Sequence, residues 1–254
     1  MNRFASVSLV LCFALVLLIA GVHLRAQTEE GDKATNLKVL DTTITHDELI
    51  SIMGDYTDAL GVHCDYCHAR KGGENSRDMD FASDQIPAKL AARSMIRMVN
   101  GINSEYIGKM KALDTPIVKV ECVTCHRGQV RPELVQDVLK RALKANGMTA
   151  LDSTYRSLRG KYYGSHTFDF SDVSLVRLAM EVSQTSDSTA LAILRLNKEF
   201  NPESAFNEWA IGQTLASLGD TTGAITALEH ALQLNPKSRR TQRDLAALKA
   251  AKKP

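Results

Sequence analysis

Residues 61–68 read GVHCDYCH and residues 120–128 read VECVTCHRG, so the pattern Cys-x-x-Cys-His occurs twice. Cysteines three positions apart lie on one face of a helical turn, where both can form thioethers to the two vinyl groups on one porphyrin edge. The histidine after the second cysteine then lies under the ring and can give a nitrogen to the iron. The sequence therefore predicts two covalently bound haem c groups, held by Cys64, Cys67, His68, Cys122, Cys125 and His126.

Two other kinds of site also use Cys-x-x-Cys pairs. A zinc ribbon places its pairs roughly 15–20 residues apart, whereas Cys67 and Cys122 are separated by most of a domain. A thioredoxin-like redox site explains neither the second copy nor the histidine in both copies. The fifth cysteine, Cys12, lies in an N-terminal apolar segment. The two motifs use the remaining four cysteines, which leaves none for a disulfide.

The composition is that of an ordinary globular protein. A chain of 254 residues holds one or two domains, and 44% hydrophobic with 24% charged residues is sufficient for a buried core. The net charge of +2 is too small to indicate nucleic-acid binding, and we expect no nucleic-acid partner. The sequence contains no glycine-rich phosphate loop and no defensible Ser/His/Asp pattern.

The N-terminus has the layout of an export signal. Arg3 precedes an uncharged run, residues 4–22, and a small residue, Ala26, offers a cleavage site. We expect residues 1–26 to be a signal peptide, the alternative being a membrane anchor formed by residues 4–22, which are long enough to span. Both alternatives place the body of the protein in the periplasm or otherwise outside the cytoplasm.

A helix is predicted directly before the first motif. Thr45 and Glu48 form a capping box, and Gly61 is a suitable residue to end the helix. An apolar stripe follows this helix at spacings of four, three and four, through Leu49, Met53, Tyr56 and Leu60. Met53 is a candidate sixth ligand of the first iron; the alternative is an ordinary core methionine.

The same order precedes the second motif. Residues 69–85 are predicted to be an exposed loop, and Pro87 marks the start of a helix that runs to about Ala112. Its apolar face carries Met95 and Met98, and Arg93 and Arg97 flank it, either as partners of haem propionates or as a solvated edge. The sequence helix, methionine, loop, Cys-x-x-Cys-His thus occurs twice, which indicates an internal duplication. His46 and His63 are interpreted as surface residues.

The last third of the chain carries a repeat. A helical pattern broken at Gly147 is followed by an aromatic connector, residues 162–170. Pro202 and Pro236 are 34 residues apart, the period of tetratricopeptide repeats. The alignment places Ala190 over Ala224, Leu194 over Leu228 and Leu178 over Gly212, with Asn197 where alanine is expected. A basic helix from Arg239 to Lys252 is predicted to cap the stack.

The first half of the chain resembles the multihaem cytochrome c subunit of photosynthetic reaction centres, over about residues 37–132, equivalent to one two-haem half of that subunit. The matching segments are Met53…Leu60-Gly61-Val62-x-Cys64-x-Tyr66-Cys67-His68, Phe81-Ala82-Ser83, Ala92-Arg93-Ser94-Met95-Ile96-Arg97-Met98-Val99-x-x-Ile102-Asn103 and Val123-Thr124-Cys125-His126-Arg127-Gly128.

The resemblance implies His/Met ligation, with each methionine on the helix before its attachment motif. By position, Met53 serves the haem on Cys64 and Cys67, and Met95 serves the second, with Met98 as its competitor. The chain departs from the family pattern by having two attachment motifs instead of four, and Lys109 near where the family can place a histidine. These departures favour a general two-haem electron carrier.

We therefore expect an all-α protein with four parts: a signal peptide (1–26), a dihaem cytochrome c domain (37–132), a helical connector (133–169) and tetratricopeptide-like repeats (170–254). The expected function is electron transfer between redox partner proteins, with a protein partner at the repeats and docking to a membrane complex as a further option. The alternative is a haem enzyme or sensor with one open axial position.

Overall fold

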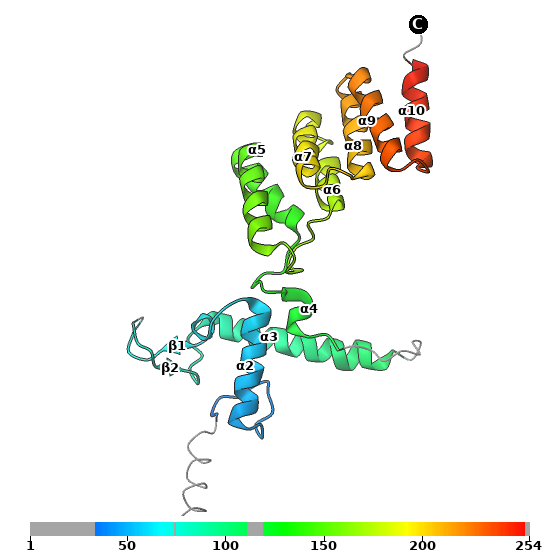
Figure 1. Ribbon diagram of the computed structural model, residues 1–254. Coiled ribbons are helices and arrows are strands. Elements are labelled where there is room, and N and C mark those ends of the chain that lie inside the picture. The colour runs from blue at the N-terminus through cyan, green and yellow to red at the C-terminus, as the bar shows by residue number, and fades with distance from the viewer. Residues whose placement is uncertain (1–33, 74, 111–118, 252–254) are drawn as a thin grey trace, which may run out of the picture. The chain divides into compact units, whose positions relative to one another are not determined.

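The computed structural model describes residues 34–73, 75–110 and 119–251, which form two compact units divided between Val130 and Arg131. The expected signal peptide or anchor lies outside the described residues. Within the described ranges, no helix has both the length and the apolar character needed to cross a membrane. The regular secondary structure of the described chain is almost all helical, as expected for an all-α protein (Figure 1).

The described residues of the first unit form three α-helices, short helical turns and one small hairpin. The hairpin is antiparallel, with Ala69 opposite Asp80 and Arg70 opposite Met79. In chain order the elements are α2 (His46–Leu60), η1 (Cys64–Tyr66), β1 (Ala69–Arg70), β2 (Met79–Asp80), α3 (Pro87–Gly101), η2 (Ile102–Tyr106), η3 (Ile107–Lys109) and α4 (Cys122–His126). Residues 69–85, expected to be a loop, therefore include this hairpin.

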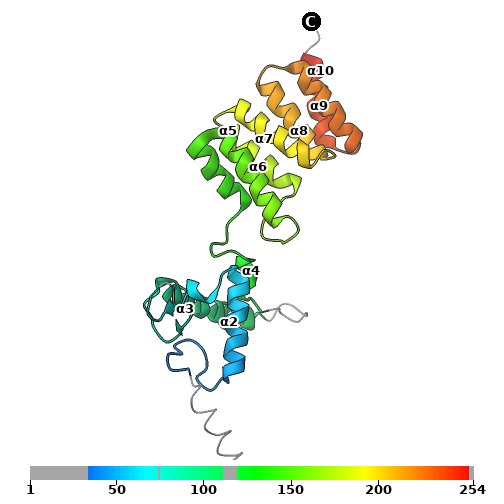
Figure 2. The same ribbon diagram turned by 60° about the vertical axis from the view of Figure 1, so that its left-hand side comes forward.

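Helix α2 begins and ends where the sequence predicts. The Thr45 hydroxyl accepts from the Glu48 backbone and the Glu48 carboxylate accepts from the Thr45 backbone, 2.8 Å away. Gly61 ends the helix in the left-handed region, at φ 66°. The Gly128 amide donates to the Ala59 carbonyl at 2.8 Å, and a Cβ on Gly61 would lie 2.4 Å from the Gly128 oxygen. The end of α2 and the loop after α4 are therefore in backbone contact (Figures 1 and 2), and only glycine fits at position 61.

Helix α3 begins at Pro87 as predicted but ends earlier than predicted. The α-helix stops at Gly101 instead of about Ala112, and the chain continues as the π-helical turn η2 and the 3₁₀ turn η3. Just past the end of α3, the Asn103 side chain bonds to the backbone of Val120. The apolar stripe alone could not show this change of winding.

The first unit has very little core of its own. Of its described residues, Ala59 is the single buried apolar side chain. Large apolar side chains remain exposed instead: Ile50, Tyr66, Phe81, Leu90, Met95, Met98, Tyr106, Met110, Val123 and Val130. A domain of this size needs a continuous core or a substitute for one. The described residues of this unit alone do not supply it.

The second unit is a stack of helices with an ordinary apolar core. It contains α5 (Val135–Tyr162), α6 (Asp172–Val182), α7 (Asp187–Phe200), α8 (Ala205–Ser217), α9 (Thr221–Leu234) and α10 (Arg239–Ala251), and neighbours from α6 to α10 pack on one another (Figures 1 and 2). Helix α5 is broken at Asn146 and Gly147, as the sequence predicts. Leu139, Leu151 and Tyr155 place it in the same core as α6 to α8.

The helices of this unit recur with the spacing read from the sequence. Helix α7 begins at Asp187 and α9 at Thr221, 34 residues later, and the same interval separates the starts of α8 and α10. The aligned pairs are buried: Ala190 with Ala224, Leu194 with Leu228, and Leu178 with Gly212. Asn197, which stands where the repeat pattern expects alanine, is also buried. Its side-chain amide donates to the Asp172 carbonyl and the Asn207 side chain.

Candidate haem-attachment site

Both Cys-x-x-Cys-His stretches form a single helical turn that brings their cysteines to one side. In the first, the Cys67 and His68 amides donate to the Cys64 carbonyl at 3.2 and 3.0 Å. The second is the short helix α4, which begins after Glu121, whose amide donates to the Thr124 hydroxyl at 3.0 Å. The helical turn that the cysteine spacing predicts is therefore present in both motifs.

His126 is held in the orientation that an iron ligand needs. Its Nδ1 lies 2.8 Å from the Gln129 carbonyl oxygen. Because a carbonyl can only accept, the bond places the proton on Nδ1 and leaves the Nε2 lone pair free. A backbone partner on the far nitrogen is the usual way in which a metal-ligating histidine is oriented. Gln129 acts through its backbone carbonyl, so no sequence pattern could indicate this role.

His68 has a different environment. Its ring meets the Phe81 ring edge-on, 5.1 Å between centroids, and its Nδ1 is buried without a hydrogen bond. Burial lowers the pKa of His68, and the positive charge of Lys89 lowers it further. The imidazole is therefore neutral at pH 7, the form that binds iron. A half-buried imidazole with an unpaired nitrogen is an unusual arrangement for a structural histidine.

The four cysteines are separate thiols, arranged as two distinct pairs. Burial raises the pKa of Cys67 and of Cys122, so both stay protonated at pH 7. In the described part of the chain, no group of three or more His, Cys, Asp or Glu side chains gathers closely enough for a metal ion. The two pairs are therefore not assembled into a shared four-ligand site.

The candidate methionines lie on the helices that precede the motifs. Met53 is half-buried on α2, while Met95 and Met98 lie one turn apart on α3 with 43% and 48% of their surface exposed. Helix α2 also reaches the second motif: burial raises the pKa of Tyr56, and nearby Cys122 adds to the effect. Helix α2 thus lies against the second motif, and Tyr56 is the side chain of this helix shown close to one of its thiols.

A buried ionic network supports the loop that contacts His68. Lys89 and Arg93 on α3 are each 8% exposed, and Lys89 Nζ donates to the Phe81 and Ser83 carbonyls at 2.7 and 2.8 Å. Arg93 pairs with Asp84 at 2.9 Å, and Asn36 donates to the same carboxylate. Arg93 was expected either to meet a propionate or to be solvated; it is buried and paired with Asp84, so it is not solvated. Its partner lies nine positions away, beyond any helix-face pattern.

Acid should weaken this network in a defined pH range. The hydrogen bond from Arg93, with that from Lys89, lowers the pKa of Asp84 from 3.8 to about 2. A folded-state pKa below the unfolded value contributes stability that is present above about pH 3.8 and lost as pH falls toward 2. Asp84→Asn should be less stable than wild type at pH 7, because two buried cations lose their anion, and the difference should shrink between pH 4 and 2.

Thermal unfolding of the two proteins at a series of pH values measures this effect. Asp78→Asn is the matched control, since Asp78 is an exposed carboxylate of the same loop with no ion pair in the described structure. An Asp84→Asn protein whose melting temperature follows the wild-type pH curve throughout would contradict the prediction.

Comparison with known proteins points to one family. Residues 21–156, more than half of the chain, match the family described as photosynthetic reaction centre cytochrome C subunit. Cytochrome c-554 of Chloroflexus aurantiacus is 41% identical over 68 residues, which are 27% of this chain and 14% of that protein. The photosynthetic reaction center cytochrome c subunit of Roseobacter denitrificans is 33% identical over 99 residues, 34% of this chain and 25% of that one.

The chain therefore spans a quarter or less of the length of these two relatives. The family match covers both Cys-x-x-Cys-His motifs, α2, α3 and all three candidate methionines. The family is one of cytochromes with covalently bound haem c, and the two motifs, the oriented His126 and the missing apolar core fit that group. The chain belongs to the photosynthetic reaction centre cytochrome c subunit family.

Proposed function

We propose that the protein is a dihaem c-type cytochrome that carries electrons between redox partners outside the cytoplasm. The proposed attachment residues are Cys64, Cys67, Cys122 and Cys125. Haem c, when bound, supplies a one-electron ferric–ferrous couple. The protein's own contribution is to hold that couple, exclude water from it and set its potential through the axial ligands.

The observation that supports the proposal most is the missing core of the first unit. Its described residues bury one apolar side chain, Ala59, and leave apolar surface around both motifs exposed. Two large apolar prosthetic groups would cover such surface and supply the burial that a small domain otherwise lacks. A purely polypeptide fold gives no reason for this pattern.

The residues have separate tasks in this proposal. The cysteines fix the ring to the chain, while His68 and His126 each offer an imidazole nitrogen to the iron. Met53 would serve the first site and Met95 the second, with Met98 as the competitor. The bond from His126 Nδ1 to the Gln129 carbonyl holds that ring in one tautomer.

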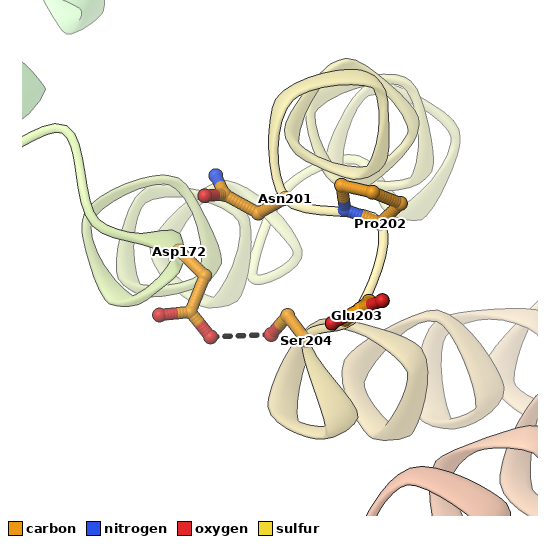
Figure 3. A pocket seen from close by; sticks show the side chains of 5 residues that line it. All are labelled: Asp172, Asn201, Pro202, Glu203 and Ser204. Atoms are coloured by element: carbon orange, nitrogen blue, oxygen red, sulfur yellow. Dashed lines mark hydrogen bonds between the residues drawn. The ribbon is translucent and has the colours of Figure 1, made fainter.

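We propose a docking role for the second unit. The 34-residue recurrence of α7 with α9, and of α8 with α10, supports a tetratricopeptide-like array, and such arrays present extended binding surfaces. An open hollow lies where α6 begins beside the turn from α7 to α8, lined by Asp172, Asn201, Pro202, Glu203 and Ser204 (Figure 3). Ser204 donates to Asp172 across it, so it presents polar groups to a partner protein.

The proposed location is extracytoplasmic, and the proposed partners are redox proteins that include a membrane complex. Family membership and the export-like N-terminal sequence support this placement. The repeats offer a surface for such a complex that is separate from the attachment motifs.

An intact mass of the protein, produced with the c-type maturation machinery, tests the proposal. A mass heavier by two haems supports it, and a ferric spectrum with both irons low-spin separates a carrier from an enzyme or sensor. A mass without haem, or a large high-spin fraction in the wild-type protein, would contradict the dihaem carrier.

A further inference from the structure

Asn103 bonds to the backbone of Val120 with both ends of its side-chain amide. Its Nδ2 donates to the Val120 carbonyl at 2.8 Å, and the Val120 amide donates to its Oδ1 at 2.8 Å. The two residues are 17 positions apart, so this pair of bonds closes a long loop. An asparagine side chain is suited to the task because it carries one acceptor and one donor group.

The Asn103 end of this link lies in a hydrogen-bonded helical turn. Asn103 lies in η2, which continues α3 without a break, and the Ile107 amide donates to the Asn103 and Ile102 carbonyls. A Cβ on Gly108 would lie 2.9 Å from the Asn103 oxygen, so the next turn is wound tightly against it. A π-helical turn inside a helix frequently marks a functional position. The side chain is therefore fixed to the helix that carries Met95 and Met98.

The Val120 end of the link lies directly before the second attachment motif. Val120 is followed by Glu121, which precedes α4 and whose amide bonds to the Thr124 hydroxyl inside the motif. A single residue, Glu121, thus separates the clamped backbone from Cys122. The link connects the methionine-bearing helix directly to the turn that carries Cys122, Cys125 and His126.

We propose that Asn103 is a positioning residue, which sets the second attachment motif at the correct distance and register from the methionine on α3. The proposal rests on the proposed function, because it assigns Asn103 a role in holding methionine as the sixth ligand of the second haem. Asn103 itself touches neither the haem-attaching cysteines nor a candidate ligand in the contacts described above.

The test uses the holoprotein in a Met53→Ala background, where the methionine–iron charge-transfer band reports the second site alone. Asn103→Ala removes both bonds, and Asn103→Asp keeps the acceptor but puts a carboxylate against the Val120 carbonyl. Asn100→Ala is the matched control, since Asn100 is an exposed amide on the same helix. Mass spectrometry confirms that every variant carries two haems.

We expect both Asn103 variants to keep two haems but to lose most of the band. Exogenous imidazole, which competes with the methionine for the iron, should bind the second site about tenfold more tightly. Asn100→Ala should behave as its parent. Because the Asp variant is nearly isosteric, it gives a result even where the Ala variant does not accumulate.

Two different failures are distinguishable. An Asn103 variant with two haems, an undiminished band and unchanged imidazole binding would overturn the positioning role and leave the proposed function intact. A Met53→Ala parent that binds two haems but shows no such band would overturn methionine ligation at the second site, and with it the role of Asn103. A parent without haem would overturn the proposed function itself.

Discussion

Without its cysteines, the full chain is expected to keep the second unit folded and to lose the first. The four-fold variant Cys64→Ala, Cys67→Ala, Cys122→Ala and Cys125→Ala removes covalent attachment at both motifs. The first unit then retains Ala59 as its one buried apolar side chain among the described residues, far too little to offset the entropy of ordering the backbone. Groups that bind only the folded state contribute their binding energy to folding.

Amide hydrogen exchange measures this directly, segment by segment. In the holoprotein, amides of α2 and α3 should be protected. In the four-fold variant their opening free energy should fall to roughly 0 kcal/mol. Amides of α6 to α9 should stay protected in both proteins, because Leu175, Ile193 and Leu194 belong to a core built from side chains alone; opening energies there can reach about 5–15 kcal/mol.

The second unit serves as the internal control, because its amides exchange in the same sample, at the same temperature and pH. Equal protection of α2 and α3 with and without attached haem would mean that the first unit has a core of its own, and the main support for the dihaem proposal would be lost. Loss of protection in both units would show instead that the variant had failed as a whole.

Sequence predicted most where a local chemical rule decides the structure. The Thr45 and Glu48 capping box, the left-handed Gly61 and the N-terminal Pro87 each depend on one or two neighbouring residues, and all three are present. The break at Gly147 and the 34-residue recurrence of helices also follow from short patterns. These features set where the helices begin, end or break, and the ends of α2 and α3 precede the two attachment motifs in the chain.

Sequence predicted least where a side chain's partner lies far along the chain. Asn103 bonds to the backbone of Val120, 17 positions on, and the buried Arg93 bonds to Asp84 and to the Asn36 carbonyl. Neither contact has a period or a motif. The hairpin of Ala69–Arg70 with Met79–Asp80 is too short to show alternation. The orientation of His126 uses the Gln129 carbonyl, a group that every residue carries.

Met95 and Met98 are the two candidates for the sixth ligand of the second haem iron. Both side chains are exposed on the same helix, one turn apart, so burial does not distinguish them. Position within the segment Ala92-Arg93-Ser94-Met95 favours Met95. Met95→Ala should abolish the methionine–iron band of the second haem and produce a high-spin fraction, because an alanine leaves the sixth position to water.

The potential should move with the ligand. A thioether favours ferrous iron relative to a second imidazole, so Met95→His should give a low-spin iron without the band and a potential lower by on the order of 0.1 V, within the roughly 0.8 V range that axial ligands span. Met98→Ala, one turn away and equally exposed, is the matched control and should keep both the band and the potential.

Spectroelectrochemical titration of the three holoproteins gives both quantities, and the first haem provides the reference in each sample. If Met98→Ala loses the band while Met95→Ala keeps it, Met98 is the ligand and the assignment by position is wrong by one helical turn. If neither single variant loses it, either sulfur can reach the iron, because residues three apart share a helix face. In that case only the double variant should become high-spin.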